Sequence, residues 1–177
     1  MTNTLVQAPP PVKHAVKVPH TLELTALFRE FMSHWAGAKT EFLDWGTVQP
    51  AAQSMECIVR LNGTVKGALV IRSTERLLGR LMVLFQEKGK GGQDKAGVFQ
   101  EMTALYSMYL INSVWMDEFF NLGPIFARPC GPQDRPPMTE SHVYCAIGVE
   151  GEPVEIRLWL DQPGGGYCAW DEKDIEP

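Results

Sequence analysis

The sequence predicts an α+β fold in which antiparallel strands form a sheet. Two observations lead to this class: the β-rich runs come in pairs, and the helical patterns do not alternate one by one with strands. Paired runs form hairpins, whereas a parallel sheet needs a crossover helix between successive strands. We expect an antiparallel sheet packed against long helices, in the order helix, hairpin, helix, helix, hairpin.

The chain divides into one predicted domain and two predicted tails. Its 177 residues fit a single domain, and a hydrophobic content of 45% can fill one core. Residues 1–19 are rich in proline and poor in large apolar side chains, which predicts a flexible tail. Residues 162–177 combine a glycine run with acidic side chains and predict a second tail. The folded domain is expected to span 20–161.

The domain begins with a predicted amphipathic helix. Thr21 is the expected N-cap, apolar residues recur every three or four positions after it, and Gly37 is the expected end. The stretch 41–52 mixes aromatic residues with glycine and proline, and predicts an irregular first strand at most.

A hairpin and a second helix are predicted next. Asn62-Gly63 separates two β-rich runs, 55–61 and 64–71, and this dipeptide between such runs is the strongest short hairpin signal. Ser73 or Thr74 then caps an amphipathic helix that stops at the Gly-Lys cluster of 88–92. The cluster lacks the residue order of a phosphate-binding loop.

The longest helical pattern covers 94–120 and is apolar around most of its girth, which predicts burial on several sides. Glycine and proline within 121–124 are expected to end this helix, with a short edge strand near 125–127. Alternating residues in 143–147 and 154–160 predict a second hairpin.

One stripe of the longest helix differs from the rest of it. Small or polar residues gather across two turns at Gln100, Glu101, Thr103, Ala104 and Ser107. Because the other sides of the helix are apolar, we expect this stripe to face solvent or a partner. It is the candidate binding surface of the chain.

Composition excludes several classes of function. The net charge of −5 provides no global positive field for nucleic acid, and no apolar run reaches the ~20 residues of a membrane span. The cysteines stand singly, without metal-ligand spacing, and no secretory signal opens the sequence; they are Cys57, Cys130, Cys145 and Cys168. We therefore expect reduced, packed thiols and a cytoplasmic protein.

Several of these patterns together resemble the CheC/CheX family of chemotaxis phosphatases. The run 62–71, followed at once by Ser73-Thr74-Glu75 and an apolar helix, resembles a conserved segment of that family. Glu101 stands where the family places the glutamate of its E-x-x-N signature, and the sequence after the long helix resembles the family's closing strands. The resemblance covers about 20–161 and implies a CheX-like antiparallel sheet with packed helices.

The resemblance also implies a partner and a reaction. Such phosphatases bind a response regulator similar to CheY; their glutamate pairs with a regulator lysine, and their asparagine orients the water that attacks the aspartyl phosphate. It implies no cofactor of the protein's own, because Mg²⁺ would belong to the bound regulator. Here the position of the asparagine holds Ala104, whose methyl group cannot orient water. Gln100 or Thr103 would have to replace the missing carboxamide.

Other interpretations stay open at this point. Glu101 also fits a solvated helix residue, and Asn112 fits a hydrogen-bonded polar group in the core. A literal E-x-x-N at 118–121 falls where the helix is expected to end, and the first helix offers only Glu23 and Glu30, without an asparagine.

The expected function is therefore a cytoplasmic signalling protein that binds a CheY-like regulator, with phosphatase activity in doubt. The alternative is a binding module without catalysis, either of this fold or as an acidic dimer like a secretion chaperone. Exposed strand edges and helix faces favour a homodimer.

Overall fold

The structure is a computed structural model that describes residues 17–43, 53–63, 66–87, 94–116, 120–131 and 142–160. Most of both predicted tails lies outside these ranges, and so do Cys168, the Gly-Lys cluster and the first half of the E-x-x-N match at 118–121. The helices and strands run in the order α1 (Thr21–Ala36), β1 (Thr40–Phe42), β2 (Ser54–Gly63), β3 (Gly67–Thr74), α2 (Glu75–Glu87), α3 (Lys95–Val114), β4 (Phe120–Cys130), β5 (His142–Val149) and β6 (Glu152–Leu160). None of the helices in the described ranges has the length and apolar character to cross a membrane.

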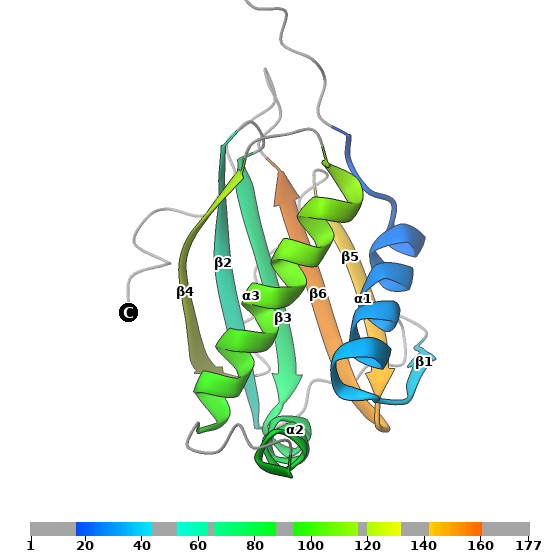
Figure 1. The fold of residues 1–177 in the computed structure, drawn as a ribbon, viewed down its shortest axis with the longest axis vertical. Helices are drawn as coiled ribbons and strands as arrows, with labels where there is room; N and C mark the ends of the chain where they lie inside the picture. The colour runs from blue at the N-terminus through cyan, green and yellow to red at the C-terminus, as the bar shows by residue number, and fades with distance from the viewer. Residues whose placement is uncertain are drawn as a thin grey trace, which may run out of the picture.

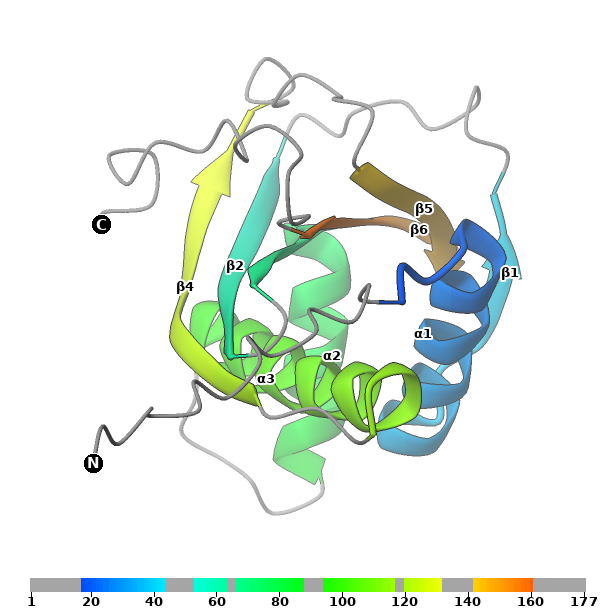
Figure 2. The same cartoon turned by 90° about the horizontal axis from the view of Figure 1, so that it is seen from above.

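The strands form one antiparallel sheet in the order β1-β5-β6-β3-β2-β4 (Figure 1). All three helices lie on the same side of this sheet, as the view from above shows (Figure 2). We call the opposite side the helix-free face, in the sense that no described helix lies there. The α+β class and the antiparallel sheet expected from the sequence are confirmed.

Both predicted hairpins are present. Strands β2 and β3 pair from Ser54↔Thr74 to Leu61↔Gly67. The predicted turn at Asn62-Gly63 is wrong, because both residues lie in β2, where they pair with Asn121 and Phe120 of β4. Strands β5 and β6 are joined through Glu150 and Gly151, whose φ angles of 52° and 77° suit the tight turn that matches the strand twist.

Local signals also set the helix ends. Gly37 closes α1 with a φ of 66°, a left-handed conformation that favours glycine. Thr74 caps α2, because its Oγ1 accepts a hydrogen bond from the Leu77 backbone N–H at 3.1 Å. The expected cap at Thr21 is wrong: this residue lies inside the first turn, and His20 occupies the cap position without a side-chain hydrogen bond.

The sequence prediction fails where α3 meets β4. The helix ends at Val114, and residues 121–124 lie within the long strand β4 instead of closing a helix. This strand pairs with β2 along most of its length, with an irregularity at Val59/Leu61. Proline at 124 and 129 is tolerated because β4 lies at the edge of the described sheet. The sequence indicated β1 only as an irregular strand within 41–52 and β4 only as a short strand near 125–127, and the expected order of helices and hairpins included neither of them.

The main core lies between the sheet and the helices. Tyr106 of α3 is fully buried, and its ring meets Phe28 of α1 edge-on at 4.9 Å between centroids. Its hydroxyl donates to the Leu24 carbonyl oxygen at 3.3 Å, so this buried polar atom has a partner. Asn112, expected in the core, is exposed instead.

The described cysteines Cys57, Cys130 and Cys145 are buried, and none of them forms a disulfide within the described ranges. Burial raises the pKa of Cys57 to about 11 and that of Cys145 to about 12, so at pH 8 their reactive thiolate forms are scarce.

We predict that a maleimide reagent at pH 8 leaves both thiols, Cys57 and Cys145, unmodified in the native protein and modifies both after denaturation. Peptide mapping by mass spectrometry checks this, and native labelling of Cys57 at the denatured rate would contradict it.

Candidate functional site

Helix α3 carries the candidate site. Asp94 fixes its start, because the carboxylate Oδ1 accepts from the Gly97 backbone N–H at 2.8 Å. Its buried side chains recur as adjacent pairs four residues apart, at Val98, Phe99, Met102, Thr103, Tyr106, Ser107, Leu110 and Ile111. The opposite side carries Gln100, Glu101, Ala104, Met108 and Asn112, which are exposed or half-buried. We call these five residues the α3 stripe.

Two residues of the sequence-predicted surface do not belong to this stripe. The expectation that Thr103 and Ser107 face solvent is wrong, because both are 0% exposed. The Ser107 hydroxyl donates to the Thr103 carbonyl oxygen at 2.7 Å, whereas the buried Thr103 hydroxyl has no hydrogen-bond partner in the described ranges. A hydroxyl side chain can be buried in a helix when the preceding turn supplies an acceptor, as Thr103 does for Ser107. The candidate surface is thereby reduced to Gln100, Glu101 and Ala104, extended by Met108.

Glu101 and Ala104 lie on the same side of α3, one turn apart. Residues at this spacing have Cβ atoms ~5–6 Å apart. Both are half-buried. A partner that meets the Glu101 carboxylate therefore also meets the Ala104 methyl group. At that position the stripe offers no hydrogen-bonding group, because Thr103 points into the core.

Helix α1 lies beside α3 and extends the surface (Figure 1). The Phe31 ring of α1 packs against the Tyr109 ring of α3 at 6.0 Å. Desolvation, followed by a hydrogen bond to Glu30, raises the pKa of Tyr109, so its hydroxyl stays protonated at neutral pH. At the other end of α1, Glu23 accepts from Lys17 Nζ at 2.6 Å, which lowers the pKa of Glu23.

This side of the molecule suits a protein partner. It presents carboxylates at Glu30 and Glu101 together with Met108, which is 53% exposed. Acidic groups around an exposed thioether favour a basic partner with an apolar centre. Across the described ranges, no group of three or more His, Cys, Asp or Glu residues is arranged to hold a metal ion.

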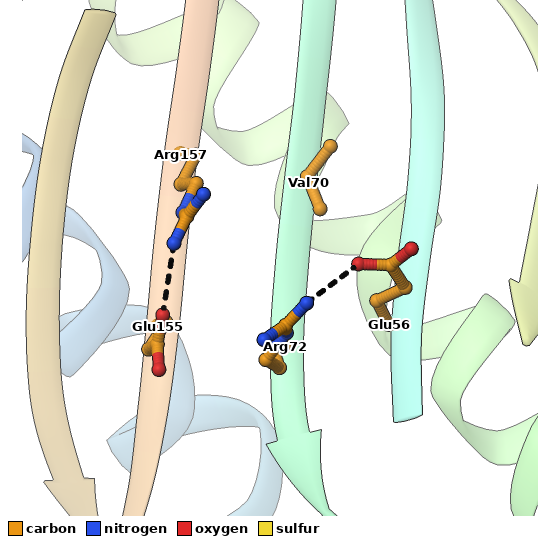
Figure 3. Close-up of a pocket in the computed structure, with 5 residues that line it drawn as sticks. All are labelled: Glu56, Val70, Arg72, Glu155 and Arg157. Atoms are coloured by element: carbon orange, nitrogen blue, oxygen red, sulfur yellow. Dashed lines mark hydrogen bonds and ion pairs between the residues drawn. The ribbon is translucent and has the colours of Figure 1, made fainter. Parts of the chain in front are cut away.

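A second polar cluster, missed from the sequence, lies on the helix-free face (Figure 3). Glu56 of β2 accepts from Arg72 of β3 at 3.2 Å and from Arg128 of β4 at 2.7 Å. Next to them Glu155 and Arg157 pair along β6 at 3.3 Å. The sheet register places Glu155, Arg72, Glu56 and Arg128 side by side across four strands, with alternating charge. We call these four residues the charged row.

Four residues of this cluster are deeply buried, whereas Arg128 has 43% of its side chain exposed. Glu56 is 1% exposed, Arg72 and Arg157 are 7% and Glu155 is 5%. Desolvation lowers the pKa of Arg157, against the opposing effect of Glu155. Together with Val70 these four residues line a cavity of about 10 Å³, enough for one water molecule.

A sequence signal for the cluster exists. Glu56, Arg72, Glu155 and Arg157 are charged residues inside otherwise apolar strands, at alternate positions that share one face of the sheet. Such residues are rarely buried unless they are paired. The pairing itself depends on the strand order, which the sequence alone does not give.

Comparison with known proteins identifies the fold. No family model matches the sequence, and no curated protein is similar to it in sequence. Solved structures do match. The chemotaxis protein CheX from Desulfovibrio desulfuricans superposes with a TM-score of 0.55 at 13% identity, over 78% of this chain and 96% of that one. CheX from Vibrio vulnificus gives a TM-score of 0.57 at 11% identity, over 78% and 93%.

A CheC-like chemotactic protein from Shewanella oneidensis also matches, with a TM-score of 0.50 at 10% identity, over 80% of this chain and 95% of that one. These matches cover nearly the whole of each known structure. The chain therefore has the fold of the CheX/CheC-like chemotaxis proteins, as its sequence patterns predicted.

Proposed function

We propose that this protein is a cytoplasmic signalling protein that binds a phosphorylated, CheY-like response regulator through the α3 stripe, and that it does not accelerate hydrolysis of the aspartyl phosphate. The observation that supports this most directly is the position of Glu101. It lies on the outward side of the helix whose sequence resembles the signature helix of the CheC/CheX family, within a CheX-like fold.

Binding follows from the charge and shape of the stripe. Glu101 provides a carboxylate for a lysine of the regulator, and the neighbouring Met108 provides apolar contact area. A carboxylate at the centre of an interface contributes more than one at its rim, because the partner shields the ion pair from water.

Hydrolysis needs more than binding, because a further group must hold the attacking water in line with the phosphorus atom. The methyl group of Ala104 cannot accept or donate a hydrogen bond, and Thr103 is directed into the core. Gln100 carries the one carboxamide close to Glu101 along the stripe, but it lies one residue before the glutamate instead of three residues after it. We propose that the protein holds the phosphorylated regulator and leaves its phosphate in place.

Replacing Glu101 with alanine tests the binding step. We predict that Glu101→Ala weakens the affinity for the beryllofluoride-activated form of a CheY-type regulator about tenfold, equivalent to about 1.4 kcal/mol. Isothermal titration calorimetry against the response regulators of the source organism, with and without beryllofluoride, measures this.

Glu23→Ala is the matched control for this experiment. It removes the same charge from the opposite end of the helical layer, where Lys17 lies beside the C-terminal end of α3 through its bond to Trp115. The control is expected to keep the wild-type affinity. If no regulator binds the wild-type chain, or if both variants bind equally well, the proposed function is wrong.

The homodimer stays a prediction alongside this function. Light scattering after size-exclusion chromatography would give the mass of the particle in solution. A particle of twice the chain mass of 19.8 kDa is the expected result.

A further inference from the structure

The helix-free face is buried, although no described helix or strand packs on it. Its apolar centre consists of Ile58, Ala68, Val70 and Trp159, none of which is more than 4% exposed. The residues of the main core pack with the helices, whereas this second cluster contains sheet residues alone. One uncovered face of a sheet would leave such side chains open to water. Something outside the described ranges therefore belongs on this face.

We propose that the segment 161–177 of the same chain folds back across the helix-free face and covers it. The segment follows Leu160 directly, at the end of β6. Strand β6 is an inner strand, and its Trp159 already belongs to the apolar cluster on that face. The segment thus starts at the surface it would cover.

The segment carries glycines first, aromatic residues second and acids last, and the face carries its apolar cluster and its arginines in the matching order. Gly164-Gly165-Gly166 allows the chain to reverse its direction after β6. The residues that come next, 167–170, include Tyr167 and Trp170, which suit the apolar cluster around Val70. The acids of 171–176 follow and suit the arginines further along the sheet.

Distances along β6 agree with this order. Trp159 lies four residues beyond Glu155, or about 13 Å at ~3.3 Å per residue. A reversed chain starting beside Trp159 reaches the apolar cluster first and the charged row second. The four residues 167–170 span about the same distance when extended.

Charge supports the same occupant. The described part of the helix-free face buries Arg72 and Arg157, carries the half-buried Arg128 beside them, and holds the carboxylates of Glu56 and Glu155. The stretch 171–176 holds Asp171, Glu172, Asp174 and Glu176 against a single lysine. Placing these acids beside the arginines lowers the desolvation cost of the buried positive charges.

Covering the helix-free face also determines which surface remains for a partner. A face covered by the chain's own segment is closed to other proteins. A protein partner then meets the side formed by α1 and α3, which the view from above shows on the opposite side of the sheet (Figure 2).

Nuclear Overhauser contacts in the full chain test this inference. With methyl labelling, we expect contacts from the rings of Tyr167 and Trp170 to the methyl groups of Ile58, Ala68 and Val70. Leu69 and Ile71 are the internal controls, because they lie on the same strand and face the helices. They are expected to show no contact with either ring.

Two serine variants sharpen the test. Trp170→Ser is expected to shift the methyl signals of Ile58 and Val70 and to leave those of Leu69 and Ile71 in place. Trp45→Ser makes the same change in another segment outside the described ranges and is expected to leave all four unchanged.

Three results would overturn the proposal. The methyl groups of Ile58 and Val70 would contact residues of 44–52 or 132–141, or they would contact a second copy in a mixed-label sample, or they would contact no residue outside the sheet. Each result leaves the proposed binding through the α3 stripe unaffected, since that surface is measured separately.

Discussion

Replacing Ala104 with asparagine is expected to turn this protein into a phosphatase for the response regulator that we propose as its partner. The new carboxamide would stand one turn after Glu101 on the exposed side of α3, where it can accept from a water molecule without adding negative charge beside the phosphoryl group. Because a single positioned polar group is typically worth ~10²-fold or more in such transition states, we expect Ala104→Asn to accelerate dephosphorylation by about 10²-fold over wild type. Phosphate release from the phosphorylated regulator, followed over time, measures this.

Met108→Asn is the matched control for this gain of activity. It places the same side chain on the same stripe one turn further along, where it is exposed but too far from Glu101 to share a phosphoryl group with it. Its rate should equal that of the wild type. If the wild-type protein already accelerates dephosphorylation and Gln100→Ala abolishes the activity, then Gln100 orients the water and the proposed loss of activity is wrong.

Replacing Glu56 with alanine is expected to cause the largest loss of stability among single substitutions in the charged row. This carboxylate is 1% exposed and accepts from both Arg72 and Arg128. Its removal takes a carboxylate away from the buried Arg72 and from the half-exposed Arg128, and breaking a buried ion pair on one side costs about 3–5 kcal/mol. For a chain of this length that corresponds to a fall in Tm of about 10 °C. Urea denaturation followed by circular dichroism gives the free energy of unfolding.

An exposed ion pair provides the comparison. Arg76 has 73% of its side chain exposed and lies 3.2 Å from Glu152. Arg76→Ala should lower the free energy of unfolding by less than about 1 kcal/mol, because water and salt screen such a pair. If Glu56→Ala and Arg76→Ala lowered the free energy of unfolding equally, burial would not strengthen the ion pairs of the charged row.

The elements with local signals were predicted well from the sequence. Asn62-Gly63 between two β-rich runs correctly indicated the β2–β3 hairpin, although both residues lie in β2. Gly37 and Thr74 act within a few residues of the helix ends that they set. The overall CheX-like fold followed from combining such signals. The position of Glu101 on the outward side of α3 also followed, because the period of a helix fixes which residues share a side.

The sequence predictions that were wrong concern features that depend on contacts between distant parts of the chain. Glycine and proline at 123–124 end most helices, yet here they continue a strand, because β2 provides a partner for β4. Gly123 fits there because an added Cβ would lie 3.0 Å from the Arg60 Cβ atom. Thr103 and Ser107 look like surface residues in the sequence, and only the packing of α3 on the sheet shows that they are buried.

The two edges of the sheet differ in how readily they could join another chain. Along β4, Pro124 and Pro129 each lack the N–H that a neighbouring strand would need, and the irregularity opposite Val59 interrupts the ladder. At the other edge β1 pairs only with 147–149 of β5. Within the described ranges, residues 142–146 of β5 thus keep one side without a strand neighbour. Ordered assembly and aggregation through backbone pairing are therefore both expected to start at β5, while β4 resists them.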